Sequence, residues 1–187
     1  MDHRTRLPSF FDSATPLDTS INEYIQKDGT KLLLTRLSFW GIVREWKNLW
    51  EKYYLPSSGV QGKSVLDVGS GCGETAYFYL MHGAVKVVCV EPNLQASTCL
   101  KANVKKNAWP VEVLEDFFVP SMLEEYHSDF MKFDAEGAES LLLECEKIPE
   151  CVLEYHSQDV KMKLQKKFDL KPLFQEKDAD LGLLASF

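Results

Sequence analysis

Lys63-Ser-Val-Leu-Asp-Val-Gly-Ser-Gly-Cys-Gly-Glu74 is the stretch that decides the fold of this chain. Its first half is a short apolar run, which is typical of a parallel strand that is covered on both faces. Three glycines follow at alternate positions, and they allow the backbone to adopt positive φ angles and to approach a ligand closely. Glu74 then begins an apolar stretch that ends near His82 and predicts a helix. The free N–H groups at the start of this helix would face a ligand in the crevice above the strand.

The spacing of the glycines separates two classes of ligand. A dinucleotide fingerprint requires a small residue at the sixth position of G-x-G-x-x-G, beside the pyrophosphate. Glu74 holds that position, and its carboxylate would repel a pyrophosphate, so NAD is the weaker interpretation. The pattern Asp67-x-Gly69-x-Gly71-x-Gly73 instead resembles motif I of the class I S-adenosylmethionine-dependent methyltransferases, whose ligand is a cationic sulfonium without phosphate. A tight turn that binds no ligand is the third interpretation.

The next predicted strand, residues 85–90, ends on Glu91-Pro92-Asn93. Glu91 follows Asp67 by 24 residues (91 − 67), which is close to the roughly 20 residues expected between a glycine loop and a ribose-binding acid. Two carboxylate oxygens can accept hydrogen bonds from both ribose hydroxyls at once. The residues expected to contact S-adenosylmethionine in these two units are Asp67, Gly69, Ser70, Gly71, Cys72, Gly73, Glu91, Pro92 and Asn93.

A third strand is predicted at residues 111–114, and it leads to Asp116 and Phe117. Asp116 could accept a hydrogen bond from an adenine amino group, and Phe117 could stack on the ring. A fourth strand at residues 130–133 and a fifth at 151–153 also end in acids. Because the carboxyl ends of parallel strands meet at one edge of the sheet, these acids should surround the crevice. Carboxylates there would favour a positively charged sulfonium.

The run Lys132-Phe-Asp-Ala-Glu-Gly-Ala-Glu139 resembles the signature of the FkbM-type methyltransferases, and Glu154-Tyr-His156 is similar to the pattern that follows strand five in that family. The resemblance covers residues 63–187. It implies methyl transfer to oxygen on a small-molecule or glycan-like acceptor. Asp134 is expected to hold the methionine end of the cofactor or the acceptor, and Glu136 or His156 to take a proton from a hydroxyl.

A metal site is not predicted from this sequence. Asp134, Glu154 and His156 have the right ligand types, but no ligand spacing supports a site. Glu136 and Glu139 would share a helix face, and either could instead cap the helix. A structural role for His156 is the alternative to a catalytic one.

Strands that alternate with helices predict a Rossmann-like, doubly wound α/β fold with a mainly parallel, seven-stranded sheet. Residues 170–174 and 181–187 should form a C-terminal antiparallel hairpin around a turn at 177–180. Residues 63–187 are therefore interpreted as a S-adenosylmethionine-binding methyltransferase domain, and residues 1–62 as an N-terminal helical extension or lid.

Within this extension, Asp18, Thr19 and Ser20 are candidate N-caps of a helix through Gln26, and Asp28-Gly29 marks a turn. Residues 30–37 fit either a strand or the start of a helix. An aromatic stripe in the following helix should face the core, with the helix packed on the sheet or acting as a lid. The stripe consists of Trp40, Val43, Trp46, Lys47, Trp50 and Tyr54.

The 187 residues are 45% hydrophobic and carry a formal net charge of −7, which fits one globular domain and argues against charge-driven binding to nucleic acid or anionic membranes. Five cysteines without a C-x-x-C pair indicate reduced thiols. Neither a signal peptide nor a membrane span is apparent, so a cytoplasmic location is expected.

The preferred hypothesis is a S-adenosylmethionine-dependent methyltransferase. An Asn/Asp-Pro-Pro-Tyr run is missing after strand four, which disfavours nitrogen acceptors in nucleic acid. The alternatives are a cofactor-binding scaffold that lacks catalysis and an NAD-dependent oxidoreductase.

Overall fold

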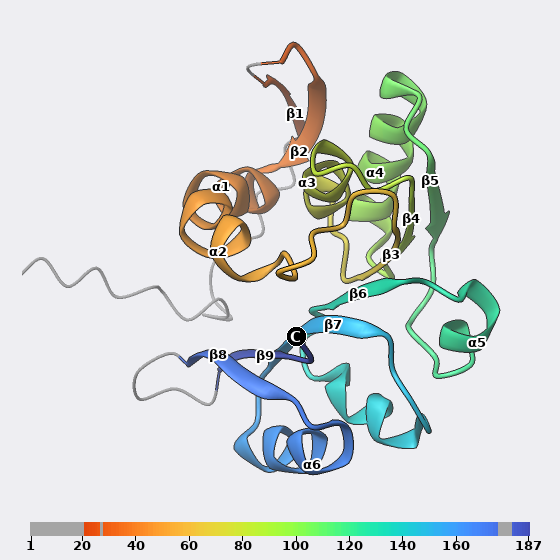
Figure 1. Ribbon diagram of the computed structural model, residues 1–187. Coiled ribbons are helices and arrows are strands. Elements are labelled where there is room, and N and C mark those ends of the chain that lie inside the picture. The colour runs from red at the N-terminus through yellow and green to blue at the C-terminus, as the bar shows by residue number, and fades with distance from the viewer. Residues whose placement is uncertain (1–20, 27, 176–180) are drawn as a thin grey trace, which may run out of the picture.

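A computed structural model describes residues 21–26, 28–175 and 181–187. Its centre is a seven-stranded sheet with the order β5-β4-β3-β6-β7-β9-β8 (Figure 1). The strands are β3 (Ser64–Val68), β4 (Lys86–Val90), β5 (Val111–Leu114), β6 (Phe130–Phe133), β7 (Glu150–Tyr155), β8 (Lys171–Gln175) and β9 (Gly182–Ala185). Strands β3 to β7 are parallel, whereas β9 runs antiparallel to β7 and β8. The predicted fold class, including the C-terminal hairpin, is confirmed; its turn at 177–180 lies outside the described residues.

Helices connect these strands in the alternating order that a doubly wound fold requires. They are α3 (Glu74–Met81), α4 (Leu94–Asn107), α5 (Met122–Tyr126), the 3-10 helix η2 (Ala138–Glu144) and α6 (Gln158–Phe168). In Figure 1, α3 and α4 lie in the upper half of the molecule, and α5 and α6 in the lower half. Among the described residues, no helix combines the length and the apolar character that a bilayer crossing needs.

Two hydrophobic clusters cover the two faces of the sheet, and the alternation of side chains along each strand assigns residues to them. In β3, Leu66 and Val68 pack with Phe133 of β6, whereas Val65 packs on the opposite face with Phe78 of α3. Residue 67 therefore points to the same face as residue 65. By the same period of two, residue 132 of β6 shares this face, and Asp67 is the direct register partner of Lys132.

The described chain begins with a two-stranded antiparallel hairpin, β1 (Ile21–Ile25) and β2 (Lys31–Thr35). The predicted helix through Gln26 is therefore wrong, and its candidate caps at residues 18–20 lie outside the described residues. The reason is the turn at Asp28-Gly29, where the Asp28 carboxylate accepts from the backbone N–H of Thr30 at 2.9 Å and reverses the chain.

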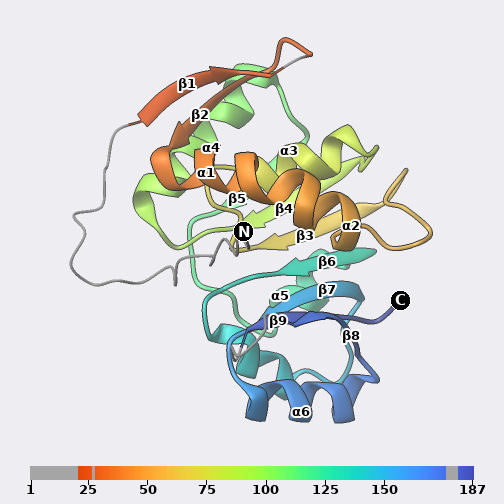
Figure 2. The same cartoon turned by 90° about the vertical axis from the view of Figure 1, so that its left-hand side faces the viewer.

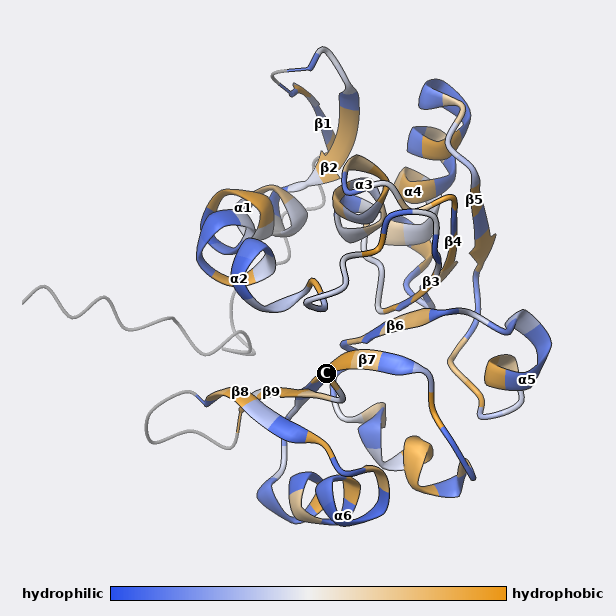
Figure 3. Ribbon diagram, viewed as in Figure 1, coloured by the Kyte–Doolittle hydropathy of each residue, from blue (hydrophilic) through white to orange (hydrophobic). Residues whose placement is uncertain are grey.

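The hairpin is held against the rest of the fold by a buried asparagine. The Asn103 side chain of α4 accepts from the N–H of Leu33 at 2.6 Å and donates to the carbonyl of Leu33 at 2.8 Å. These are the two backbone hydrogen bonds that a neighbouring strand would otherwise supply. Its amide also donates to the carbonyl of Cys72 in the glycine loop at 2.8 Å. Leu32 and Leu34 are fully buried in a cluster with Tyr77 of α3 and Cys99 of α4, and β2 accordingly carries the hydrophobic colour in Figure 3.

The hairpin leads into a helical segment made of α1 (Arg36–Glu45), the π-helical turn η1 (Trp46–Trp50) and α2 (Glu51–Tyr53). Figure 2 shows this segment beside α3, where the rings of Trp46 and Phe78 meet at 5.1 Å. Residues 30–37 thus contain both a strand and a helix start.

The aromatic stripe is only partly buried. Trp50 and Tyr54 are core residues, but Trp40 and Val43 are 42% and 55% exposed, and Lys47 is exposed as well. The π-helical turn explains the difference, because its wider period rotates the face of α1 relative to the face that Trp50 and Tyr54 present to the core. The stripe prediction is therefore wrong for the first part of this helix.

Candidate functional site

The order of the strands reverses between β3 and β6, where open α/β sheets bind their ligands. The glycine loop after β3 lies directly against the end of β6 at this point. Gly69 has φ +73°, and a Cβ there would stand 1.7 Å from the carbonyl oxygen of Asp134. Its N–H donates to the carbonyl of Val90 at the end of β4. Only a glycine fits between these two backbones, so the loop joins three strand ends.

Glu91, at the end of β4, holds the loop from the other side. Its carboxylate accepts from the N–H of Gly71 and from the N–H of Asn93, both at 2.8 Å. Burial raises the pKa of Glu91, and these two N–H groups partly offset the rise. Each carboxylate oxygen keeps one lone pair for a further donor. Asn93 in turn caps α4, since its side chain accepts from the N–H groups of Gln95 and Ala96.

At the end of β5, two adjacent aromatic residues have different environments. Phe118 is buried edge-on against Phe133 at 5.0 Å, whereas Phe117 is 73% exposed and lines the pocket. Phe117 is therefore available for stacking. The Asp116 carboxylate accepts from the N–H of Phe117 at 2.7 Å.

Beneath the loop lies Lys132, a lysine with 2% of its side chain exposed. Its ammonium group donates to the carbonyl of Gly69 at 2.6 Å and lies 3.3 Å from Asp67 and 3.5 Å from Asp134. Burial opposes the charged form, but the two carboxylates outweigh it, so the pKa of Lys132 is raised. Thr75 donates to the second oxygen of Asp67 at 2.6 Å. Lys132 thus supports the loop from inside the sheet.

The N-terminal helical segment forms the opposite wall. Ser38, Gly41 and Glu45 of α1 line the pocket, together with Thr35 at the end of β2. The Trp50 indole donates to Glu45 at 3.2 Å. Burial, followed by the charge of Asp134, raises the pKa of Glu45. The segment therefore packs on the core and forms one wall of the pocket, whereas its role as a lid stays a prediction.

Glu154 in β7 and His156 directly after it lie near Asp134. Burial and the neighbouring Asp134 raise the pKa of Glu154. The Nδ1 atom of His156 hydrogen-bonds with Glu139, which is the main reason that the pKa of His156 is raised above 6.5. His156 is thus engaged by a buried carboxylate, and its Nε2 atom lies 3.6 Å from Glu136 and 4.0 Å from Glu154.

These elements enclose a pocket of about 550 Å³. Nine of the predicted site residues line it: Gly69, Ser70, Gly71, Glu91, Pro92, Asn93, Phe117, Asp134 and Glu136. The other five do not line it. Asp67 and Cys72 are buried below the loop, and burial raises the pKa of the Cys72 thiol to about 12. Gly73 faces the side chain of Leu100. Asp116 is exposed, and His156 contacts the pocket residue Glu136 without lining the pocket.

Sequence reasoning missed Lys132, Glu74 and the polar residues of the α1 wall as parts of the site. A lysine inside an otherwise apolar strand was the available signal for Lys132, because such a charge requires a buried partner. No comparable signal marked Ser38 or Glu45, whose position depends on how the helix docks.

Glu74 begins α3 and also lines the pocket. Its Oε2 atom is buried without a hydrogen-bond partner, as is the hydroxyl of Ser70 nearby. Burial raises the pKa of Glu74 from 4.5 to about 7, although hydrogen bonds with its own backbone N–H and with Ser38 oppose the rise. The pocket wall therefore holds two polar atoms that lack partners within the protein.

We expect the raised pKa of Glu74 to make the free energy of unfolding depend on pH. Between pH 4.5 and about 7 only the unfolded state ionises Glu74, so the free energy of unfolding falls as the pH rises, and it levels off above that range. Glu74→Gln should reduce the fall by about 3 kcal/mol, measured by urea unfolding at several pH values. Glu124→Gln, on the exposed side of α5, is the control. An unchanged pH profile in Glu74→Gln would contradict the shift.

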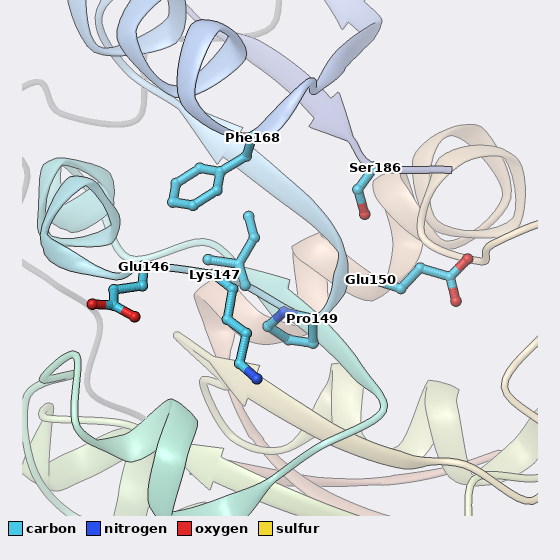
Figure 4. A pocket seen from close by; sticks show the side chains of 7 residues that line it. Glu146, Lys147, Pro149, Glu150, Phe168 and Ser186 are labelled. Atoms are coloured by element: carbon cyan, nitrogen blue, oxygen red, sulfur yellow. The ribbon is translucent and has the colours of Figure 1, made fainter.

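A second hollow, of about 480 Å³, lies at the opposite ends of the strands (Figure 4). It is lined by residues 146–150 together with Phe168 and Ser186. None of the predicted site residues reaches it, and it is more open than the pocket at the glycine loop. We therefore place the candidate site at the glycine loop.

Comparisons with known proteins agree with this architecture. No family profile matches the sequence. A 16S rRNA N2 G1207 methyltransferase of T. thermophilus, solved with S-adenosylmethionine and guanosine, is 20% identical and aligns with a TM-score of 0.57 over 89% of this chain and 49% of that one. The ribosomal protein L11 methylase of Lactobacillus delbrueckii subsp. bulgaricus is 17% identical, with a TM-score of 0.50 over 67% and 69% of the two chains.

One curated relative also matches. Over 70 residues the sequence is 37% identical to the electron transfer flavoprotein beta subunit lysine methyltransferase of Mus musculus. This segment is 37% of the present chain and only 28% of the relative. Together with the solved structures, it supports a fold of the class I S-adenosylmethionine-dependent methyltransferases, whereas the FkbM type remains a prediction.

Proposed function

We propose that this chain is a S-adenosylmethionine-dependent methyltransferase that holds its cofactor in the pocket at the glycine loop. One observation carries the proposal: the loop, Glu91 and Phe117 line a single pocket at the point where the strand order reverses. The pocket also contains the unpartnered polar atoms of Ser70 and Glu74, as expected of a site built for a polar ligand.

The residues present fit this cofactor in kind. Glu91 has free lone pairs for the ribose hydroxyls, and the exposed ring of Phe117 can stack on adenine. Among the described residues that line the pocket, Lys132 is the single lysine or arginine, and its ammonium is directed to the loop carbonyl. A pyrophosphate would have little to bind here, so NAD is disfavoured.

When bound, S-adenosylmethionine supplies a methyl group on a positively charged sulfur. The protein's own part is to hold an acceptor in line with that methyl group and to exclude water. Glu45, Asp134 and Glu136 line the pocket with carboxyl groups that favour the positive charge. Glu136 is 62% exposed and lies at the pocket wall, where it can take a proton from the acceptor.

The nature of the acceptor remains a prediction. The FkbM resemblance implies an oxygen on a small-molecule or glycan-like acceptor. The names of the similar proteins indicate other acceptors, a lysine of a protein and a guanosine of ribosomal RNA. An acceptor screen with labelled cofactor should therefore contain all three classes. A cytoplasmic location also remains a prediction; all five cysteines are free and buried.

The test is calorimetric titration of the full chain with S-adenosylhomocysteine, the product form of the cofactor. Glu91→Gln should weaken binding by about 1 to 3 kcal/mol, because it replaces charge-assisted hydrogen bonds. Glu112→Gln, an exposed acid on β5 that pairs with Lys86, is the matched control and should bind normally. Unchanged affinity in Glu91→Gln would remove this residue from the site. Failure of the wild-type protein to bind at millimolar concentration would overturn the proposal.

A further inference from the structure

At the end of the pocket beside β6, three potential metal ligands converge from two strand ends. Asp134 and Glu136 follow β6, and His156 follows β7. One ligand atom from each residue lies within 4.8 Å of the other two. Donor atoms about 2.0 to 2.3 Å from one ion are separated by about 3 to 4.5 Å, so the present spacing is near that of a bound site.

The orientation of His156 supports this interpretation independently of the cluster. Its Nδ1 atom hydrogen-bonds with Glu139, whose side chain is 2% exposed. An ionised carboxylate can only accept, so Nδ1 carries a proton, and Nε2, which faces Glu136 and Glu154, is the nitrogen that would bind a metal after releasing its own proton. Histidines that bind metals are commonly oriented in this way by a carboxylate on the other nitrogen.

The backbone also directs Glu136 into the cluster. Glu136 has φ +42°, a left-handed conformation that is uncommon for a residue with a side chain, and Gly137 follows with φ +93°. This turn ends β6 and places the Glu136 carboxylate 3.6 Å from Nε2 of His156. Such local strain is frequent at binding sites.

The charges around the cluster are unbalanced. Three acidic side chains lie together, those of Asp134, Glu136 and Glu139, whereas two cationic groups face them, Lys132 and His156. The charge of Lys132 is also shared with Asp67 and the loop carbonyls. A divalent cation would supply the missing positive charge.

We propose that Asp134, Glu136 and His156 bind a divalent transition-metal cation of the Mn²⁺ type beside the cofactor pocket. One imidazole nitrogen with carboxylate oxygens is a mixed donor set, which suits Mn²⁺ better than Ca²⁺ or Cu⁺. Asp134 and Glu136 line the pocket, so the open side of the ion faces the space that an acceptor would occupy.

This inference rests on the proposed function, which it deepens by favouring an oxygen acceptor. A cation lowers the pKa of a bound hydroxyl, which then releases its proton to water or to a carboxylate. The acceptor oxygen forms the new bond to the methyl carbon. The carbon–sulfur bond breaks with its electron pair on sulfur, which becomes a neutral thioether.

The experiment titrates the full chain with Mn²⁺ and follows the electron paramagnetic resonance signal of the free ion. The wild-type protein should bind one Mn²⁺ per chain. Glu136→Gln and His156→Ala should each weaken binding by about tenfold or more, as should Glu139→Gln, which acts through the orientation of His156. Glu144→Gln changes an exposed acid on the same 3-10 helix as Glu139, and it should bind as the wild type does.

Thermal melting identifies any variant that loses binding by unfolding; Glu136→Gln changes an exposed side chain, so this variant should keep its fold. Equal Mn²⁺ affinity in wild type, Glu136→Gln and Glu139→Gln would overturn the metal site. Titration with S-adenosylhomocysteine without metal separates the two proposals, because the cofactor can bind when Mn²⁺ does not. Absence of Mn²⁺ binding alongside normal cofactor binding would remove only the metal site.

Discussion

Replacing Gly69 by alanine should abolish cofactor binding and lower the free energy of unfolding by more than about 3 kcal/mol. An added Cβ would stand 1.7 Å from the carbonyl oxygen of Asp134, and neither backbone can yield without opening the contact between β3 and β6. The positive φ of +73° adds a conformational cost. Urea unfolding and titration with S-adenosylhomocysteine measure the two effects.

Gly59→Ala is the matched control for this prediction. Gly59 also has a positive φ, +68°, but nothing lies within 4 Å of its added Cβ. The control should therefore show only the conformational cost, about 1 to 2 kcal/mol, with cofactor affinity unchanged. Equal destabilisation of the two variants would mean that the glycine loop and the end of β6 are not in contact.

Lys132→Met should lower the free energy of unfolding by about 3 to 5 kcal/mol, because it leaves the buried carboxylate of Asp67 without its cation. Methionine has a similar length, so loss of packing contributes little. The additional change Asp67→Asn removes the unpaired charge and should restore a large part of the stability. A double variant no more stable than Lys132→Met would contradict this pairing.

Lys132 and Asp67 should affect the pH dependence of the free energy of unfolding in different pH ranges. The raised pKa of Lys132 means that its stabilising contribution is complete below 10.5 and is lost only when the pH rises through the higher folded value. Burial already raises the pKa of Asp67 above 3.8, and loss of Lys132 should raise it further. The loss in free energy of unfolding caused by Lys132→Met, relative to the wild type, should therefore become smaller as the pH falls toward 3.8. The double variant, which has no carboxylate at residue 67, should not show this change.

The parts of the fold predicted from sequence are those that local patterns determine. The strands β5 and β6 have the predicted bounds because each is an apolar run between turn residues. The glycine loop and Glu91 lie together because strand ends meet at one edge of a parallel sheet. The sequence marks the turn at Asp28-Gly29, but no local pattern shows that the residues on its two sides pair as strands.

Other features depend on tertiary structure and have no local pattern. Asp67 meets Lys132 only because β3 and β6 pair in one particular register. The wall formed by Ser38 and Glu45 depends on the docking of α1. No sequence pattern places Glu139 beside His156, because a separate connection of the chain brings the two side chains together.

The bonds of Asn103 also bear on how the chain acquires its shape during synthesis. The segment containing β2 leaves the ribosome before α4 has been made, and domains begin to fold as they emerge. Leu32 and Leu34 therefore stay exposed to water until Asn103 has been synthesised and can hydrogen-bond with Leu33 and with the carbonyl of Cys72. A segment that is translated before α4 is thus among the last to reach its final position, and a nascent chain halted before α4 should be a substrate for chaperones.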